Sequence, residues 1–153
     1  MPDLYETFRE VVQTLDARGI PFAICGGLAM AIHARPRATV DIDLIAPPDV
    51  IAALGMAAAT LGFRAHPTTL VVAGGSVVIH RLTKIVPGDP DVLVLDVIEV
   101  RPGPTGEAWA SRVTHGWEGR RVSAVSREAL IALKRLRGSP QDLADIAALE
   151  QPE

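Results

Sequence analysis

The chain has 153 residues and a formal net charge of −3, with 48% hydrophobic and 22% charged residues. These proportions are ordinary for a globular protein and exclude a disordered chain or a coiled coil. The acidic balance and the low aromatic content, 4%, argue against a protein that binds nucleic acid through bulk electrostatics or by stacking along a strand.

The length suits one compact domain, and we expect residues 1–153 to form a single domain. The first residues lack the basic start and apolar run of a signal peptide, so the cytoplasm is the expected compartment. No stretch approaches the roughly 18 apolar residues that a membrane-spanning helix requires. No membrane partner is therefore expected.

The N-terminal half alternates helical and extended patterns, with Gly26-Gly27 as a tight turn between two of them. In chain order the patterns predict a helix over 4–18, a strand over 20–25, a helix over 28–34, a strand over 39–45 and an alanine-rich helix over 49–61.

The C-terminal half combines a hairpin with two capped helices. Two strands over 70–73 and 76–80 are expected to turn through Gly74 and Gly75 alone, since glycine takes the positive φ of a primed two-residue turn. An apolar strand over 92–98 follows, and serine caps predict helices over 127–137 and 140–149. The fold class predicted is α/β (α+β), a small mixed β-sheet with helices packed around it.

Two carboxylates lie two residues apart on the predicted strand over 39–45. Asp41 and Asp43 therefore leave the same face of the strand, close to each other. Such a pair raises a carboxylate pKa or binds a cation, and hard oxygen ligands suit Mg²⁺ together with substrate phosphates. The alternative is a strand edge that is merely exposed to water.

Asp96 interrupts the apolar strand over 92–98, where an unpaired acid would be costly to desolvate. If this strand lies beside that of Asp41 and Asp43, three carboxylates converge and can bind two divalent ions. The alternative is an ion pair with an arginine such as Arg37 or Arg81.

Gly26 and Gly27 follow a predicted strand and precede a helix, so their backbone can approach a phosphate closely. The alternative is a simple tight turn. Neither a GxGxxG loop nor a GxxxxGK[ST] loop is present, which argues against Rossmann and P-loop proteins.

These features together resemble the DNA polymerase β-like nucleotidyltransferase superfamily. The resemblance rests on Ile24-Cys25-Gly26-Gly27, on Asp41-Ile42-Asp43-Leu44 and on Asp96 in a later strand. The segment Ala34 to Leu44 and the ending Leu130-Ile131-Ala132-Leu133-Lys134 with Gln141 to Ile146 resemble small bacterial members related to abortive-infection and type IV toxin–antitoxin toxins. The similarity spans roughly residues 20–149.

The resemblance implies a site for Mg²⁺ and a nucleoside triphosphate (NTP). Asp41, Asp43 and Asp96 would hold the metals, two ions in the family's pattern, while Gly26 and Gly27 would cradle phosphates. Two departures are the glycine at position 27, where active members often have serine, and a long spacer before Asp41.

Residues on the C-terminal helices complete the implied site. Lys134 would match the family lysine and could neutralise a triphosphate oxygen. The alternative is that Lys134 only faces water, on one helix face with Arg135 and Arg137. Asp142 is explained by the capping box that starts at Ser139, whereas Asp145, one turn later, is not.

Arg37 and Thr39 share the expected strand face of Asp41, where they could bind phosphate or only balance the charge of the aspartate. The function expected is transfer of a nucleoside monophosphate from an NTP to an acceptor hydroxyl on an RNA end such as tRNA, a protein or a small molecule. A toxin role with a cognate antitoxin is implied by family likeness alone. The alternative is a catalytically inactive nucleotidyltransferase-like binding or regulatory module.

Overall fold

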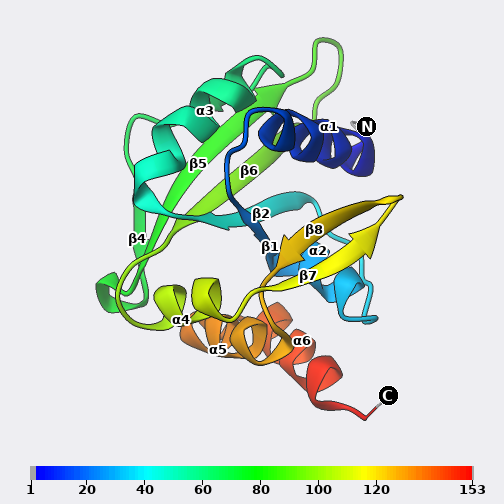
Figure 1. Cartoon of the computed structure of the whole chain (residues 1–153), viewed down its shortest axis with the longest axis vertical. Coiled ribbons are helices and arrows are strands. Elements are labelled where there is room, and N and C mark those ends of the chain that lie inside the picture. Colours follow the sequence, from blue (N-terminus) through cyan, green and yellow to red (C-terminus); the bar gives the residue numbers. More distant parts are fainter. Residues whose placement is uncertain (1–2, 153) are drawn as a thin grey trace.

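The structure is a computed structural model that describes residues 3–152. One sheet of eight strands carries six helices in the described chain (Figure 1). The helices are α1 (Leu4–Ala17), α2 (Gly26–Ile32), α3 (Ile51–Ala59), α4 (Pro104–Ala110), α5 (Arg127–Arg137) and α6 (Pro140–Glu150). The strands are β1 (Ala23–Cys25), β2 (Asp41–Ala46), β3 (Arg64–Ala65), β4 (Leu70–Val72), β5 (Val77–Ile85), β6 (Val92–Glu99), β7 (Val113–Trp117) and β8 (Arg120–Ala124).

The sheet is mixed, as the sequence predicts. Its strand order is β3-β5-β6-β2-β1-β8-β7, and β4 pairs with β5 beside β3. At the centre β2 runs parallel to β6 and antiparallel to β1. The two strands expected to carry acidic residues are therefore direct neighbours.

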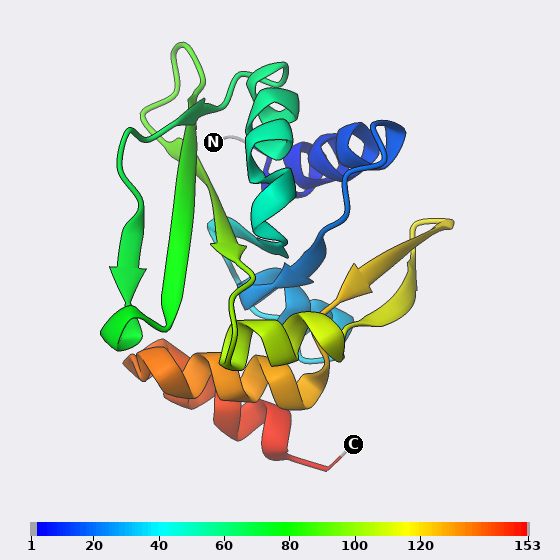
Figure 2. The ribbon, with the colours of Figure 1, turned by 60° about the vertical axis from the view of Figure 1, so that its left-hand side comes forward.

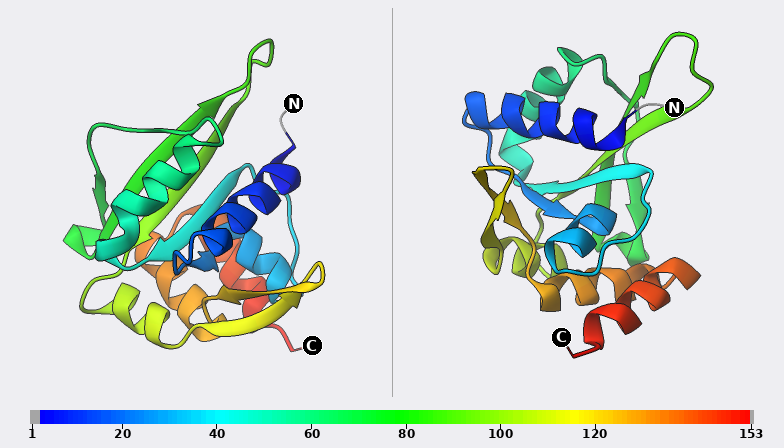
Figure 3. Two further views of the ribbon diagram at one scale, coloured as in Figure 1. Left: turned by 45° about the horizontal axis from the view of Figure 1, so that its top comes forward. Right: turned by 90° about the vertical axis from the view of Figure 1, so that its right-hand side faces the viewer.

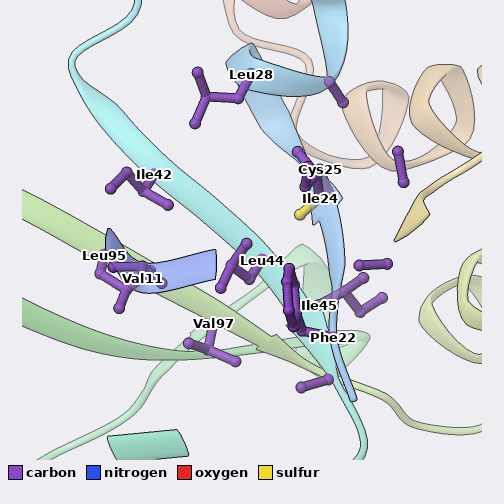
Figure 4. Close-up of a cluster of buried hydrophobic side chains, with 14 of the residues drawn as sticks. Val11, Phe22, Ile24, Cys25, Leu28, Ile42, Leu44, Ile45, Leu95 and Val97 are labelled. Carbon is purple, nitrogen blue, oxygen red and sulfur yellow. The ribbon is translucent and has the colours of Figure 1, made fainter. Parts of the chain in front are cut away.

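Alternation along the central strands puts apolar side chains on one face and the acidic side chains on the other. Ile42, Leu44, Leu95 and Val97 are fully buried on one face, beside Val11 of α1 (Figure 4). Helices α1 and α3 cover that side of the sheet, whereas α5 and α6 lie across the other (Figure 2). The acidic residues project from the second face because they alternate with the buried ones.

The helix caps read from the sequence are present at the C-terminus. Ser126 accepts a hydrogen bond from the backbone N–H of Ala129, and Ser139 and Asp142 form a complete capping box. These local bonds satisfy the first N–H groups of α5 and α6, which explains why these two helices begin where the sequence predicts.

Several boundaries differ from the sequence-based expectations. Gly26 and Gly27 are not a turn before α2 but its first two residues. Strand β2 begins at Asp41, so Arg37 and Thr39 precede it and do not share its face. The expectation that these two residues alternate on the strand with Asp41 is wrong, because the chain after Pro36 is irregular up to residue 40.

The hairpin is antiparallel as expected, but its turn is longer. Val72 pairs with Val77, so residues 73–76 form the connection, with a 3₁₀ turn at Ala73–Gly75. Strand β5 also continues to Ile85, and the connection from β5 to β6 projects from the body of the protein (Figure 3). The prediction of a primed two-residue turn is wrong, because the connection is longer and Ala73 also takes a positive φ, 53°.

The region between β6 and α5 contains structure that the sequence patterns did not reveal. Helix α4 starts at Pro104, inside the expected loop, and β7 and β8 form an antiparallel hairpin that adds β8 beside β1. None of the helices in residues 3–152 has the length and apolar character needed to cross a bilayer.

Candidate active site

The carboxylates of β2 and β6 lie side by side because the two strands are in register. Asp43 is paired with Asp96 in the parallel ladder, and Asp41 lies two residues earlier on the same face of β2. The expectation that the strand of Asp96 lies beside that of Asp41 and Asp43 is confirmed.

Asp41 and Asp43 are not in direct contact with a cationic side chain of the described residues, although Arg137 attracts both from a distance. Within residues 3–152 neither carboxylate makes a hydrogen bond or an ion pair. Burial, and then repulsion from Asp96 and Asp41, raises the pKa of Asp43 to about 7. Burial and repulsion from Asp96 also raise the pKa of Asp41. Two partly buried carboxylates without a partner favour either a proton or a bound cation.

Asp96 differs because it already has a partner. Arg81 lies opposite it in the antiparallel β5–β6 ladder and donates two hydrogen bonds to its carboxylate, each 2.9 Å long. This is the ion pair given above as the alternative for Asp96. Within the described residues, no group of three or more His, Cys, Asp or Glu side chains is arranged to hold a metal ion. The carboxylates that fit a cation as the structure stands are those of Asp41 and Asp43.

The glycines are required by the packing of the site itself. Gly26 has a φ of 62°, and a Cβ atom there would overlap the carboxylate of Asp43. A Cβ on Gly27 would lie 2.5 Å from the Oγ1 of Thr39 and 3.2 Å from a guanidinium nitrogen of Arg37. The space that a side chain at position 27 would need is therefore filled by Thr39.

Lys134 is buried rather than solvated. It is 5% exposed, and its Nζ donates a 2.7 Å hydrogen bond to Asp145 and lies 3.9 Å from Asp142. The alternative of a water-facing lysine is wrong, because α5 packs against α6 and turns this position inward.

Asp145 and Asp142 are surrounded by donors. Arg37 donates two hydrogen bonds to Asp145, at 2.7 and 2.8 Å, and Gln141 donates a third. Although burial alone would raise the pKa of Asp145, the bonds from Arg37 and Lys134 lower it to about 2. Burial would likewise raise the pKa of Asp142, but hydrogen bonds from Arg137 and Ser139 lower it to about 2.

One pocket brings part of these groups together between the sheet and α5. Its charged lining consists of Asp43, Asp96, Lys134, Arg137 and Asp142, next to Gly26. The remaining site residues predicted from sequence do not line it: Asp41, Gly27, Arg37, Thr39 and Asp145.

Arg81 and Arg137 are the charged residues whose place in the site the sequence did not reveal. Arg81 entered only as one of two possible partners of Asp96, and Arg137 only as part of a charged helix face. Arg137 attracts the carboxylates of Asp43 and Asp41 and donates two hydrogen bonds to Asp142. Its spacing of three residues from Lys134, which puts both on one side of α5, is the signal that could have identified it.

Comparison with known proteins relates the fold to solved structures. No protein-family model and no curated protein sequence matches the chain. The crystal structure of ANT(2'')-Ia in complex with adenylyl-2''-tobramycin matches with a TM-score of 0.64 and 19% identity, over 93% of this chain and 84% of that one. The lincomycin-bound lincosamide antibiotic adenylyltransferase LnuA matches with a TM-score of 0.68 and 12% identity, over 95% and 96% of the two chains.

A third similar structure is the antigenic nucleotidyltransferase-like protein from Paracoccidioides brasiliensis. It has a TM-score of 0.55 and 20% identity, over 94% of this chain and 74% of that one. At these identities the likeness concerns the fold. The chain has the nucleotidyltransferase fold, an open mixed sheet with helices on both faces, as predicted from its sequence.

Proposed function

We propose that this chain is a Mg²⁺-dependent nucleotidyltransferase that moves a nucleoside monophosphate from an NTP to an acceptor hydroxyl and releases pyrophosphate. The observation that carries the proposal is the pair Asp41 and Asp43, which leave one face of β2 without any cation partner in residues 3–152. The fold supports it, since the similar structures include adenylyltransferases.

The donor set fits a hard divalent cation, because Asp43 offers carboxylate oxygens in the pocket and Asp41 adds its own from two residues earlier on the same face of β2. When bound, Mg²⁺ would offset the charge of the triphosphate and polarise the reacting phosphate. Asp96, which Arg81 keeps oriented, would accept the proton of the acceptor hydroxyl. The acceptor oxygen then bonds to the α-phosphorus while the bond to the β-phosphate oxygen breaks.

The triphosphate would lie between the start of α2 and the cations of α5. Arg137 has the accessible charge there, since its side chain is 64% exposed while still held by Asp142. Lys134 would add a buried point charge. Arg37 and Asp145 would act by holding Lys134 and the segment before β2 in place.

Thr39 offers a replacement for the serine missing at position 27. Its Oγ1 lies 2.5 Å from the place where a Cβ atom of residue 27 would be. A hydroxyl is therefore available beside Gly27 from a different residue. The glycine at position 27 is compatible with a phosphate contact made by Thr39.

Of the three acceptor classes, the small molecule is favoured. ANT(2'')-Ia is seen with an adenylylated tobramycin and LnuA with lincomycin, both small molecules. An RNA end is disfavoured by the net charge of −3. A toxin role with a cognate antitoxin remains a prediction from family likeness.

Incubation of the protein with each labelled NTP, Mg²⁺ and candidate acceptors tests the proposal. Pyrophosphate release and label transfer are expected with wild type, and Asp43→Asn should lower the rate on the order of 10³-fold, since several kcal/mol of charge stabilisation are lost. Asp49→Asn, an exposed aspartate after β2, is the matched control. Transfer that persists in Asp43→Asn contradicts the site, and no pyrophosphate release with any NTP contradicts the activity.

The Arg81–Asp96 ion pair favours a second candidate, an inactive nucleotide-binding or regulatory module. With Asp96 paired to Arg81, two of the three carboxylates predicted as metal ligands, Asp41 and Asp43, are left free. Calorimetry separates the two: NTP binding without pyrophosphate release supports the module, and turnover rules it out.

A further inference from the structure

The pocket that holds the charges of the site continues into an apolar part, which we name the aliphatic slot. Its lining comes from β4, β5 and β6 on the sheet and from α5. The side chains that define it are Val72, Val77, Ile79, Ile98, Leu133 and Leu136.

The aliphatic slot begins directly at the third carboxylate. Ile98 follows Asp96 by two residues on β6 and therefore lies on the same face of the sheet. Ile79 is paired with Ile98 just as Arg81 is paired with Asp96. A molecule lying on these isoleucines would bring its end to Asp96, while Gly26 and Asp43 lie on the β1–β2 side of the same pocket.

The lining excludes two kinds of acceptor. No aromatic residue lines this pocket, so no platform is present on which the bases of an RNA end could stack. The slot itself has no acidic side chain to match a polycation. Of the acids that line the rest of the pocket, Asp142 is paired with Arg137, Asp96 is paired with Arg81, and Asp43 is assigned to the metal. What the slot offers is aliphatic surface that gains free energy when apolar groups cover it.

We propose that the aliphatic slot binds the acceptor, and that this acceptor is an uncharged small molecule with a hydroxyl group on an aliphatic body. The inference rests on the proposed function, because it takes the reacting hydroxyl to lie at Asp96. It goes further by assigning the acceptor to a class, which separates this chain from enzymes that modify cationic sugars or RNA.

Calorimetric titration with alkyl glucosides from methyl to hexyl tests the slot directly. These probes combine an uncharged hydroxyl-bearing head with an aliphatic chain of adjustable length. The affinity should rise about fourfold for each added methylene that enters the slot. Tobramycin and total tRNA serve as the cationic and the nucleic-acid comparison.

Two neighbouring residues of β4 provide a matched pair of variants. Val72 lines the slot and Val71, on the opposite face of the same strand, does not. Val72→Asp should weaken the binding of hexyl glucoside at least tenfold and abolish the dependence on chain length, whereas Val71→Asp should leave both unchanged. Leu136→Gln tests the helical wall, with Leu143→Gln on the exposed surface of α6 as its control.

The outcomes separate this inference from the proposed function. Chain-length-dependent binding without nucleotide transfer supports the slot and contradicts the activity. Transfer to tobramycin or tRNA, with no binding of alkyl glucosides, supports the activity and overturns the slot. Loss of hexyl glucoside binding when adenosine is added in competition would also overturn the inference, because the slot would then be the site of the nucleobase.

Discussion

The acidic residues on the strands and those on the C-terminal helices lie in opposite electrostatic environments. Asp43 on β2 has no partner, and burial raises its pKa to about 7. Asp145 on α6 is buried too but accepts hydrogen bonds from Arg37, Lys134 and Gln141, which lower its pKa to about 2. Burial opposes ionisation in both places, so the difference comes from the partners that each fold element supplies.

This difference indicates distinct roles. The paired acids join α5, α6 and the segment before β2, and so stabilise the arrangement of elements around the pocket. The unpaired acids destabilise the folded protein, and a bound cation would remove this cost. Both sides of this contrast can be tested by substitution.

Asp145→Asn should lower the free energy of unfolding by about 3–5 kcal/mol, because it leaves the buried Lys134 and Arg37 without their carboxylate. Urea denaturation measures the loss. The control is Glu150→Gln, which breaks an ion pair with Arg135 whose side chains are 62% and 51% exposed, and which should cost about 0–1 kcal/mol. Equal losses in the two variants would show that the buried cluster does not hold the helices.

Arg81→Gln should destabilise the protein by about 2 kcal/mol, since Asp96 loses two charge-assisted hydrogen bonds beside Asp43. The loss is smaller than for Asp145 because the Arg81 side chain is 36% exposed to water.

Mg²⁺ should restore more stability in Arg81→Gln than in wild type, since a divalent ion can balance the freed carboxylate. The measurement is unfolding with and without Mg²⁺ at matched ionic strength. Arg101→Gln, which removes the neighbouring pair with Glu99, is the control. A Mg²⁺ effect no larger than in wild type would mean that the strand carboxylates do not bind the ion together.

The free energy of unfolding should fall as pH rises from about 4 to about 7. The folded protein keeps a proton on Asp43 that the unfolded chain releases near its ordinary pKa of 3.8, so this stabilisation is present at low pH and lost as pH passes 7. The groups that act on Asp43 are Asp96, Asp41, Arg137 and Lys134.

The expected change is on the order of 2 kcal/mol between pH 5 and pH 7, measured by urea denaturation at each pH. Asp145 and Asp142 stay ionised throughout this range, because their pKa values near 2 confine their titration to lower pH. Asp43→Asn should flatten the slope and Asp49→Asn should not. An unchanged slope in Asp43→Asn would place the titrating group elsewhere.

Gly26→Ala should cost about 1–2 kcal/mol more than Gly119→Ala. Both glycines have positive φ, 62° and 76°, but only at Gly26 would the added Cβ overlap Asp43. Thermal unfolding of the two variants isolates this contact from backbone strain. Equal destabilisation would show that the start of α2 can move away from the carboxylate.

Much of the local structure could be predicted because it depends on neighbours in the chain. The caps at Ser126 and Ser139 are made within three residues, and both helices start as expected. The hairpin of β7 and β8 was missed, because β7 has no buried residue and β8 has two, Val122 and Ala124, which is too short an alternation to mark a half-buried strand.

In the candidate site, too, the local features could be predicted and the tertiary contacts could not. That Asp41 and Asp43 share a face, and that Asp96 needs a partner, follow from the two-residue period of a strand and the cost of burying a charge. The choice of Arg81 as that partner depends on the register of β5 against β6, a contact between residues 15 positions apart.

By itself the sequence determined the acids, the glycines and the class of fold, since strand alternation, turn preferences and helix caps act over a few residues. The tertiary structure alone decided which charges are neutralised: it buried Lys134 against Asp145, put Thr39 where a side chain of residue 27 would lie, and left Asp41 and Asp43 without a cation. The physical reason is that charge balance and burial depend on groups that the folding of distant segments brings together.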